Sequence, residues 1–490
     1  MTVLRNEVRR GTYLDSVALM RISRTLAARH GVEEAGVMIG TEPNKQILRD
    51  ARVLGPEGEA ALPGDLIIAI RAADPAAADA AVAEARQLID QPRRAAAKAS
   101  EWRPRTLQAA LKELPEANLA LISVPGTFAV PEARKALRCG LNVMIFSDNV
   151  PLADEVALKR EARELGLLVM GPDCGTAIIH GVPLAFANVV PQGDIGIIGA
   201  SGTGIQEVSC LIADNGGGIS HAIGTGGRDL SAEVGGITTL MAIDLLDADP
   251  ATRHIVIISK PPAEDVAAAV LARVRQSKKS FAICFLGGTD HPMPDNAKAT
   301  RTLRGAADIA LGRELPRYNS RGGDRSGLLV RGLFSGGTLC AEAQVVFLRA
   351  GMRVASNAAV RGAVSPLVPD THVMLDLGDD EYTQGRPHPM IEPEVRVPHL
   401  AAALRDDSVG VILLDVVLGY GGHLEPVEAI VRTVVAAGTH GKTVIASVTG
   451  TDNDPQNLGR QIRALQAARV LVHTAMSDAA LTALSFVGAG

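Results

Sequence analysis

Two segments of the chain carry the same small polar residues at the same spacing, each between an apolar stretch and a stretch with helical periodicity. Glycine lets backbone N–H groups approach a ligand closely, and the N-terminus of a helix carries about half a positive charge. A Gly-rich turn that opens a helix therefore binds anions such as phosphate. The predicted phosphate-binding residues are Ser201, Gly202, Thr203, Gly204, Ser335, Gly336, Gly337 and Thr338. The alternative is that these small residues only allow a helix to pack closely on a sheet.

A glutamate follows the threonine of each turn, at Glu207 and at Glu342. Both would lie one turn into a helix, where a carboxylate either acts near the anion or stabilises the helix dipole. Their matched placement favours the first role, and we predict both as catalytic residues. A third Gly-rich turn adds Gly421 and Gly422 as phosphate-binding candidates and His423 as a catalytic candidate.

Other reactive side chains are predicted to have structural roles. The segment 438–443, GTHGKT, lacks the first glycine of a Walker A loop and precedes a strand, so we predict no P-loop there. Asp290 and His291 fit a solvated turn, residues 386–389 fit a surface loop, and Cys174 fits a buried small side chain. No metal site is predicted.

The two phosphate-binding turns open two copies of one pattern. Residues 193–315 and 327–480 each run from the Gly-rich turn to an acidic turn before a buried strand, and then to a shared Gly-Thr-Asp at 288–290 and 450–452. We predict a tandem duplication of doubly wound, flavodoxin-like α/β domains at 192–316 and 326–490. Duplicated domains usually pack about a pseudo-twofold axis, which would bring both helix ends to one anion.

The first half of the chain predicts two further domains. Residues 1–95 form a small α+β domain in this interpretation, with a strand at 16–22 (SVALMRI) and a helix capped by Asp74. Residues 106–188 alternate apolar strands with helices and predict a Rossmann-like parallel sheet, although no G-x-G-x-x-G turn opens it. Residues 91–105 would link the two.

Composition limits the class of protein and its partners. The chain has 490 residues, 47% of them apolar, with 50 glycines and 3% aromatic residues, which suits several α/β domains with aliphatic cores. A net charge of -5 without a basic run argues against nucleic acid or membrane partners. The 5 cysteines form no CxxC pair, and no long apolar run is present, so we expect a cytoplasmic protein acting on a small molecule.

Three segments resemble a known enzyme family. Residues 193–230 look like the CoA-ligase domain of the succinyl-CoA synthetase α subunit, and residues 117–176 resemble the later part of its CoA-binding domain. Residues 406–423 in the second copy are similar to the carboxy-terminal domain of the β subunit. As a whole the chain resembles the FdrA family of acyl-CoA-synthetase-like proteins, whose N-terminal region looks like residues 1–95.

The chain departs from the synthetases in parts that ATP-driven ligation needs. The relatives carry a phosphorylated histidine in a G-H-A-G loop after the strand that corresponds to residues 282–288, and this chain reads GGTDHPMPDN there. The ATP-grasp domain and the first Gly-rich turn that contacts CoA are also missing. The two phosphate-facing turns are kept.

Resemblance to the FdrA family implies a subunit of oxamate carbamoyltransferase, a transferase of allantoin and purine catabolism. That reaction converts oxalurate and phosphate to oxamate and carbamoyl phosphate, and no cofactor is assigned to it. The resemblance implies phosphate or carbamoyl phosphate as a substrate and a hetero-oligomer with other carbamoyltransferase subunits. Two alternatives stay open: a succinyl-CoA-synthetase-like acyl-CoA ligase subunit that uses CoA, and a non-catalytic scaffold that binds an anion and organises partner subunits.

Overall fold

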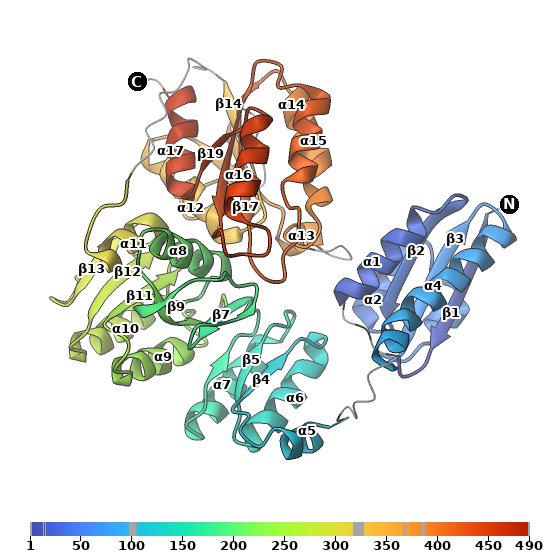
Figure 1. Cartoon of the computed structure of the whole chain (residues 1–490), viewed down its shortest axis with the longest axis horizontal. Coiled ribbons are helices and arrows are strands. Elements are labelled where there is room, and N and C mark those ends of the chain that lie inside the picture. Colours follow the sequence, from blue (N-terminus) through green and yellow to red (C-terminus); the bar gives the residue numbers. More distant parts are fainter. Residues whose placement is uncertain are drawn as a thin grey trace. The chain divides into compact units, whose positions relative to one another are not determined.

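A computed structural model describes residues 2–12, 14, 16–97, 104, 106–316, 328–365, 368, 370–383 and 388–488. Two compact units divide the chain (Figure 1). The first contains residues 1–113 and 380–387, and the second contains residues 114–379 and 388–490. Each unit is described by itself.

The first unit contains a three-stranded antiparallel sheet in the order β1-β3-β2. Its strands are β1 (Val3–Arg9), β2 (Val32–Ile39) and β3 (Leu66–Ala72). Its helices include α1 (Ser16–Ala27), α2 (Glu42–Asp50), α3 (Pro56–Glu59), α4 (Pro75–Ala97) and α5 (Leu107–Glu113). Side chains alternate between the faces of a strand, so Ile68 and Ile70 of β3 pack in one core with residues of α1 and α4, and Ile67 packs in a second core with Leu48 of α2.

One element of this unit differs from the sequence prediction. The segment 16–22 begins α1 and is not a strand. Leu19, Ile22 and Leu26 are buried at helical spacing, whereas a short apolar run read alone fits a strand equally well. Asp74 caps α4 as predicted, since its Oδ1 accepts the N–H of Ala77 at 2.9 Å.

The second unit begins with a parallel sheet of three short strands in the order β4-β5-β6. Its elements are β4 (Leu119–Ile122), α6 (Gly126–Arg138), β5 (Asn142–Ile145), α7 (Leu152–Glu164) and β6 (Val169–Met170). The following hairpin, β7 (Thr176–Ile179) and β8 (Val182–Ala185), lies within the predicted range 106–188 but pairs with β10 of the next sheet. Because β7 and β8 pair with the next sheet, the Rossmann-like sheet ends at about residue 175 and not at residue 188.

The first repeat, residues 192–316, is a doubly wound sheet as predicted. Its strands are β9 (Gln192–Gly199), β10 (Ile219–Gly224), β11 (His254–Ser259), β12 (Ser280–Phe285) and β13 (Ala297–Thr300). They lie in the order β13-β12-β11-β9-β10, all parallel. Its helices are α8 (Gly202–Asp214), α9 (Ile237–Ala248), α10 (Glu264–Gln276) and α11 (Leu303–Leu311).

The second repeat, residues 326–490, has the same central strand order with one more strand at its edge. Its strands are β14 (Leu329–Phe334), β15 (Val354–Ser356), β16 (His372–Asp376), β17 (Val409–Val417), β18 (Thr443–Thr449) and β19 (Leu471–His473), in the order β15-β16-β14-β17-β18-β19. Its helices are α12 (Gly337–Arg349), η1 (Pro393–Arg396), α14 (Val397–Arg405), α15 (Glu428–Ala437), α16 (Leu458–Ala467) and α17 (Met476–Val487). The short helix α13 (Asp380–Thr383) belongs to the first unit.

The two repeats share one hydrophobic core. Helices α8 and α11 of the first repeat pack against α12 and α17 of the second (Figure 1). Buried side chains from all four helices, among them Val208, Ala306, Phe347 and Ala479, belong to a single cluster. The N-termini of α8 and α12 are therefore held close together by burial of apolar surface, not by local sequence.

A buried ion cluster joins α7 to the first repeat. The ammonium of Lys159 is fully buried and donates to Glu155 Oε1 and Asp229 Oδ1, each at 2.8 Å, and to Thr225 O at 3.0 Å. Asp229 also accepts the N–H groups of Thr238 and Thr239 at the start of α9. Arg228 lies 2.8 Å from Glu155 Oε2, so two cations balance the two buried carboxylates.

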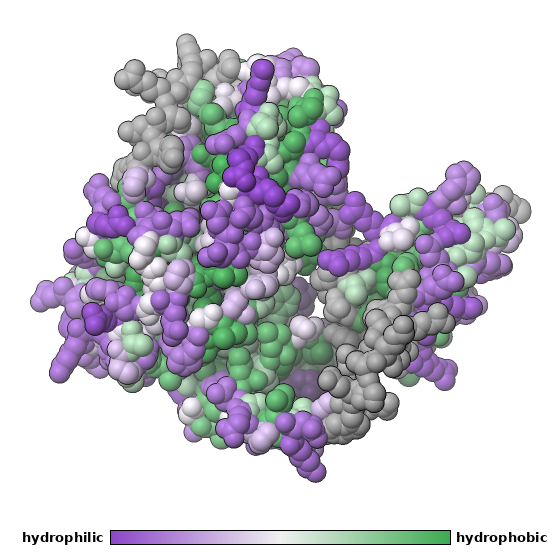
Figure 2. Space-filling view, viewed as in Figure 1, coloured by the Kyte–Doolittle hydropathy of each residue, from purple (hydrophilic) through white to green (hydrophobic). Residues whose placement is uncertain are grey.

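Figure 2 shows hydrophilic residues over much of the visible surface, with hydrophobic residues in areas among them. Over the residues that the structure describes, no helix is long and apolar enough to cross a membrane.

Candidate functional site

The first Gly-rich turn lies between the end of β9 and the start of α8. Ser201 is the N-cap of α8, and its Oγ accepts the N–H of Gly204 at 3.0 Å. Small polar residues at such a position satisfy one of the free N–H groups of a helix start. The turn is therefore a regular helix start that leaves its other N–H groups available.

The second turn faces the first, which confirms the expectation that the two helix ends converge. The hydroxyls of Ser201 and Thr338 are 2.5 Å apart and share a hydrogen bond. A Cβ atom at position 336 would lie 3.0 Å from the side chain of Thr203, a tight contact, so glycine eases this approach. Two positive helix ends thus meet across the boundary between the repeats.

Four backbone N–H groups at these helix ends have no acceptor among the described residues. They belong to Gly202, Thr203, Gly337 and Thr338. Unsatisfied N–H groups at a helix start, reinforced by the dipoles of two helices, favour an anion. This arrangement can hold a phosphate or carboxylate group.

Two charged residues that we did not predict lie at the same opening. Asp376 ends β16, and its Oδ2 lies 2.6 Å from the Cβ position of Gly337. The ammonium of Lys260, which follows β11, lies 4.0 Å from the same Cβ position. Burial raises the pKa of Asp376 to about 6, while the N–H of Gly378 and the charge of Lys260 lower it. The opening thus combines free N–H groups, one cation and one titratable carboxyl.

His388 is a third neighbour of this opening. Its Nε2 lies 2.5 Å from the Cβ position of Gly378, and Oδ1 of Asp376 lies 3.2 Å from that position. Burial lowers the pKa of His388 to about 4, so the ring is neutral at ordinary pH. The prediction of a surface loop at 386–389 is wrong for Pro389, which is buried, and for the imidazole of His388; residues 386 and 387 lie outside the described residues.

Glu207 and Glu342 are brought to the boundary between the repeats, but their partners are backbone groups. Glu207 in α8 accepts the N–H of Met476, the first residue of α17, at 3.1 Å. Glu342 in α12 accepts the N–H of Leu303, the first residue of α11, at 2.6 Å. Each glutamate therefore caps the last helix of the other repeat. Both are fully buried, and this geometry gives them a structural role.

Burial also sets the charge of these two glutamates. It raises the pKa of Glu342 to about 8, and the N–H of Leu303 opposes this rise. Burial and the nearby charge of Glu342 raise the pKa of Glu207 well above its ordinary value. A catalytic role for either residue stays a prediction, and we build no reaction step on them.

Gly421, Gly422 and His423 lie at the end of β17, away from a helix start, because α15 begins only at Glu428. A Cβ atom at position 421 would lie 2.8 Å from the ring of Phe186, so close packing explains this glycine. His423 is exposed, and its Nδ1 accepts the N–H of Glu425 at 3.1 Å. No contact recorded in the described part of the chain joins these three residues to the α8 and α12 turns.

Most of the remaining motifs are located where the sequence predicts. GTHGKT lies in the turn before β18. Asp290 is exposed and paired with Arg301. The prediction of a solvated turn is wrong for His291, whose side chain is only 9% exposed. Cys174 is buried, and burial raises the pKa of its thiol to about 12, so it is an inert thiol.

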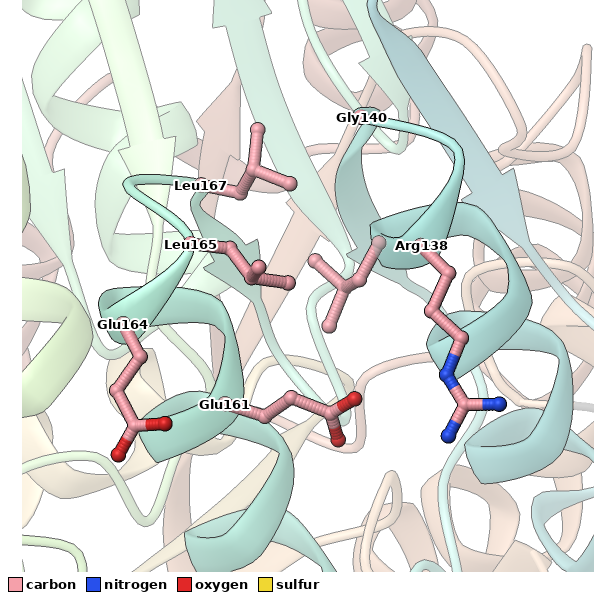
Figure 3. Close-up of a pocket in the computed structure, with 7 residues that line it drawn as sticks. Arg138, Gly140, Glu161, Glu164, Leu165 and Leu167 are labelled. Atoms are coloured by element: carbon pink, nitrogen blue, oxygen red, sulfur yellow. The ribbon is translucent and has the colours of Figure 1, made fainter.

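A hollow of about 490 Å³ lies elsewhere in the second unit, between the C-terminal ends of α6 and α7 (Figure 3). Leu165 and Leu167 contribute apolar surface, and Arg138 and Glu161 lie on opposite sides of the opening. Ligands of open parallel sheets bind at the carboxyl ends of the strands, whereas this hollow borders the segments that lead into β5 and β6. It carries no candidate chemistry.

Three families match parts of the chain. Residues 1–104 match the family described as AllF, heavy metal-associated domain. Residues 191–287 match the CoA binding domain, and residues 333–486 match the CoA-ligase family. The CoA-binding match thus falls on the first repeat and not on residues 106–188.

Known proteins are similar to the chain over its whole length or over part of it. The uncharacterized protein YahF of Escherichia coli (strain K12) is 41% identical, over 99% of this chain and 98% of that protein. A mitochondrial succinate–CoA ligase [ADP-forming] subunit alpha-2 of Trichomonas vaginalis is 26% identical over 36% of this chain, which spans 58% of that subunit. A solved acetyl-coenzyme A synthetase of Ca. Korarchaeum cryptofilum is 15% identical and has a TM-score of 0.33, over 75% of this chain and 82% of that chain.

A heavy metal does not fit the domain that the first match describes. Such metals prefer soft thiolate ligands, and the chain has no cysteine before Cys139. Among the described residues, no group of His, Cys, Asp and Glu side chains could hold a metal ion. No step is assigned to a metal.

Proposed function

Since the chain belongs to the same family as Escherichia coli YahF and carries CoA-binding and CoA-ligase domains, we propose that it is an acyl-CoA-ligase-type subunit. In this proposal it holds the phosphate end of an acyl phosphate where α8 and α12 meet, and the acyl group passes to the thiol of CoA. The thiol sulfur forms a bond to the acyl carbon, the C–O bond to phosphate breaks, and inorganic phosphate leaves. The thiol proton goes to the phosphate.

The meeting of the two turns is the observation that carries this proposal. The bond between Ser201 and Thr338 holds two helix starts against one opening, and the charge of Lys260 reaches the same place. N–H groups fixed in advance around a leaving phosphate stabilise the charge that develops on it. Asp376, with a pKa of about 6, can exchange a proton with the phosphate.

Residues at the carboxyl ends of β4 and β5 would contact CoA in this proposal. Thr127 and Asn149 are exposed there. The guanidinium of Arg228 donates to Val150 O at 2.8 Å beside the same loop, and it also pairs with Glu155 Oε2 at 2.8 Å. These groups fit a phosphate-bearing ligand, although Asp148 is also exposed at this edge.

The test uses the full chain with acetyl phosphate and CoA, and follows thioester formation. Wild type should form acetyl-CoA, and Gly202→Val should lose most of the rate, because its side chain would cover the free N–H groups and lie 3.0 Å from Thr176 Oγ1. Gly64→Val is the matched control, since a Cβ atom at position 64 meets nothing within 4 Å. An unchanged rate in Gly202→Val would contradict the site assignment.

Carbamoyl transfer is the second candidate, and it uses the same phosphate site. Residues 286–296 contain no G-H-A-G loop, which favours a donor other than a phosphorylated histidine. In that case oxalurate and phosphate would give oxamate and carbamoyl phosphate, with partner subunits in a hetero-oligomer. Micromolar CoA binding in calorimetry would support ligation, whereas no CoA binding together with carbamoyl phosphate formation would support carbamoyl transfer. Phosphate binding without either reaction would support the scaffold alternative.

A further inference from the structure

The two carboxyl oxygens of Asp376 have different neighbours. Oδ2 lies 2.6 Å from the Cβ position of Gly337, at the start of α12, and the carboxyl carbon lies 3.6 Å from it, so Oδ2 is the oxygen nearer to the opening. Oδ1 accepts the N–H of Gly378 at 3.0 Å. The N–H of Asp376 donates to Asn357 Oδ1 at 2.9 Å, which fixes the end of β16. Of the two oxygens, Oδ2 is therefore the one that faces a ligand at the helix starts.

His388 lies beside the other oxygen of this carboxyl. Its Nε2 is 2.5 Å from the Cβ position of Gly378, and Asp376 Oδ1 is 3.2 Å from the same position, so the two atoms border one small space. The other ring nitrogen, Nδ1, accepts the N–H of Met390 at 3.2 Å. A neutral imidazole carries one N–H group. Since Nδ1 is an acceptor, the proton of His388 is on Nε2, the nitrogen beside Asp376.

The Nε2–H group of His388 has no acceptor among the described residues, and Asp376 Oδ1 is a carboxyl oxygen next to it. A donor in such a place favours a hydrogen bond to that oxygen, either directly or through one water. Hydrogen bonds between catalytic groups are often long before the ligand binds. With the N–H of Gly378 already on Oδ1, a second donor there leaves Oδ2 as the oxygen that carries the proton of a neutral Asp376.

The surrounding charges allow Asp376 to exist in both protonation states. The charged residues that act on it are Lys260, Asp379 and Asp415. Burial raises its pKa to about 6, and Lys260 opposes this rise. His388 adds no charge, because burial lowers its pKa to about 4. The negative charge of a bound phosphate group favours the protonated carboxyl further.

We propose that His388 is a positioning residue, whose Nε2–H binds Oδ1 of Asp376 so that a protonated Oδ2 faces the phosphate group between the helix starts. This inference rests on the proposed function for the identity of the ligand. When the C–O bond of the acyl phosphate breaks, Oδ2 gives its proton to the leaving phosphate oxygen. The proton of the CoA thiol then replaces it, so Asp376 ends the reaction protonated as it began.

Two substitutions of His388 separate this role from a structural one. His388→Asn keeps an acceptor for the N–H of Met390 but has no donor at the distance of Nε2, whereas His388→Gln places an amide N–H at about that distance. With acetyl phosphate and CoA, kcat should fall at least about tenfold in His388→Asn, with KM changed less than about threefold, and should recover in His388→Gln. His440→Asn, at an exposed histidine before β18, is the control and should match wild type. A wild-type rate in His388→Asn, an equal loss in both variants, or an unfolded His388→Asn would overturn the inference.

The pKa of Asp376 gives a second readout that needs no ligand. The difference in free energy of unfolding between wild type and Asp376→Asn, followed against pH, reports that pKa. In the His388→Asn background its midpoint should move up by at least about half a pH unit, because the ionised carboxyl has lost a donor. An unchanged midpoint would also overturn the inference. If wild type forms no thioester but the midpoint moves, the proposed function fails while the pairing of His388 with Asp376 stands.

Discussion

The buried carboxylate of Glu342 makes the stability of the paired repeats depend on pH in a defined direction. Burial raises the pKa of Glu342 from its ordinary value of 4.5 to about 8 in the folded protein. A group whose pKa is higher in the folded state contributes stability that is complete below its unfolded pKa. That contribution is lost as the pH rises through the folded pKa. Stability should therefore fall between pH 4.5 and pH 8.

The size of this effect follows from proton linkage. One proton that is bound only in the folded state gives a slope of at most about 1.4 kcal/mol per pH unit, and about 5 kcal/mol over the whole window. Glu342→Gln cannot ionise and keeps an oxygen for the N–H of Leu303. The free energy of unfolding of Glu342→Gln, relative to wild type, should therefore rise with pH at up to that slope and level off above about pH 8.

Urea unfolding followed by circular dichroism, from about pH 5 to about pH 9, measures this difference. Glu314→Gln is the control, because it removes an exposed carboxylate and should leave the pH dependence unchanged. Parallel curves for wild type and Glu342→Gln would refute the reasoning, since they would show that Glu342 has the same pKa in both states. Glu207→Gln should also lessen the fall in stability with pH, because burial and the charge of Glu342 raise the pKa of Glu207 well above its ordinary value.

Three further predictions concern other parts of the second unit. Lys159→Met should lower the free energy of unfolding by about 3 to 5 kcal/mol in urea, because Asp229 would be left buried without its ion pair and Glu155 would keep only Arg228; a loss below about 1 kcal/mol would contradict this charge balance. Sulfate, which does not titrate in this range, should bind more tightly as the pH falls through about 6, because Asp376 becomes neutral; the same dependence in Asp376→Asn would exclude that carboxyl as its cause. In the folded protein Cys139 alone should react quickly with a thiol reagent, since the other cysteines are buried; a second fast thiol would contradict this packing.

Features that depend only on neighbouring residues were predicted correctly from the sequence. The Gly-rich turns at 201–204 and 335–338 open helices as predicted, and Asp74 caps α4, because capping depends on residues within one turn of the helix start. Apolar strands alternating with helices predicted the parallel sheets correctly. The segment 16–22 was interpreted as a strand because a short apolar run fits both periodicities.

Contacts between residues that are far apart in the sequence could not be predicted from local sequence patterns. Glu207 and Glu342 looked like partners of an anion, because sequence places them one turn into their helices but does not show which helix lies opposite. Asp376 could have been suspected, since it ends a buried strand two residues before a glycine, and ligands collect at such ends. Asp415 accepts the N–H groups of Ser335 and Gly336 but lies within an apolar run of β17, where local sequence does not indicate its partner Arg396.

The sequence by itself determined that two helix starts of this chain are built to receive an anion, because glycines and hydroxyl groups act on the backbone beside them. Only the tertiary structure decided that the two starts face each other. That decision depends on residues distant in sequence, such as Ser201 and Thr338, which meet only when the sheets assemble and the shared core forms.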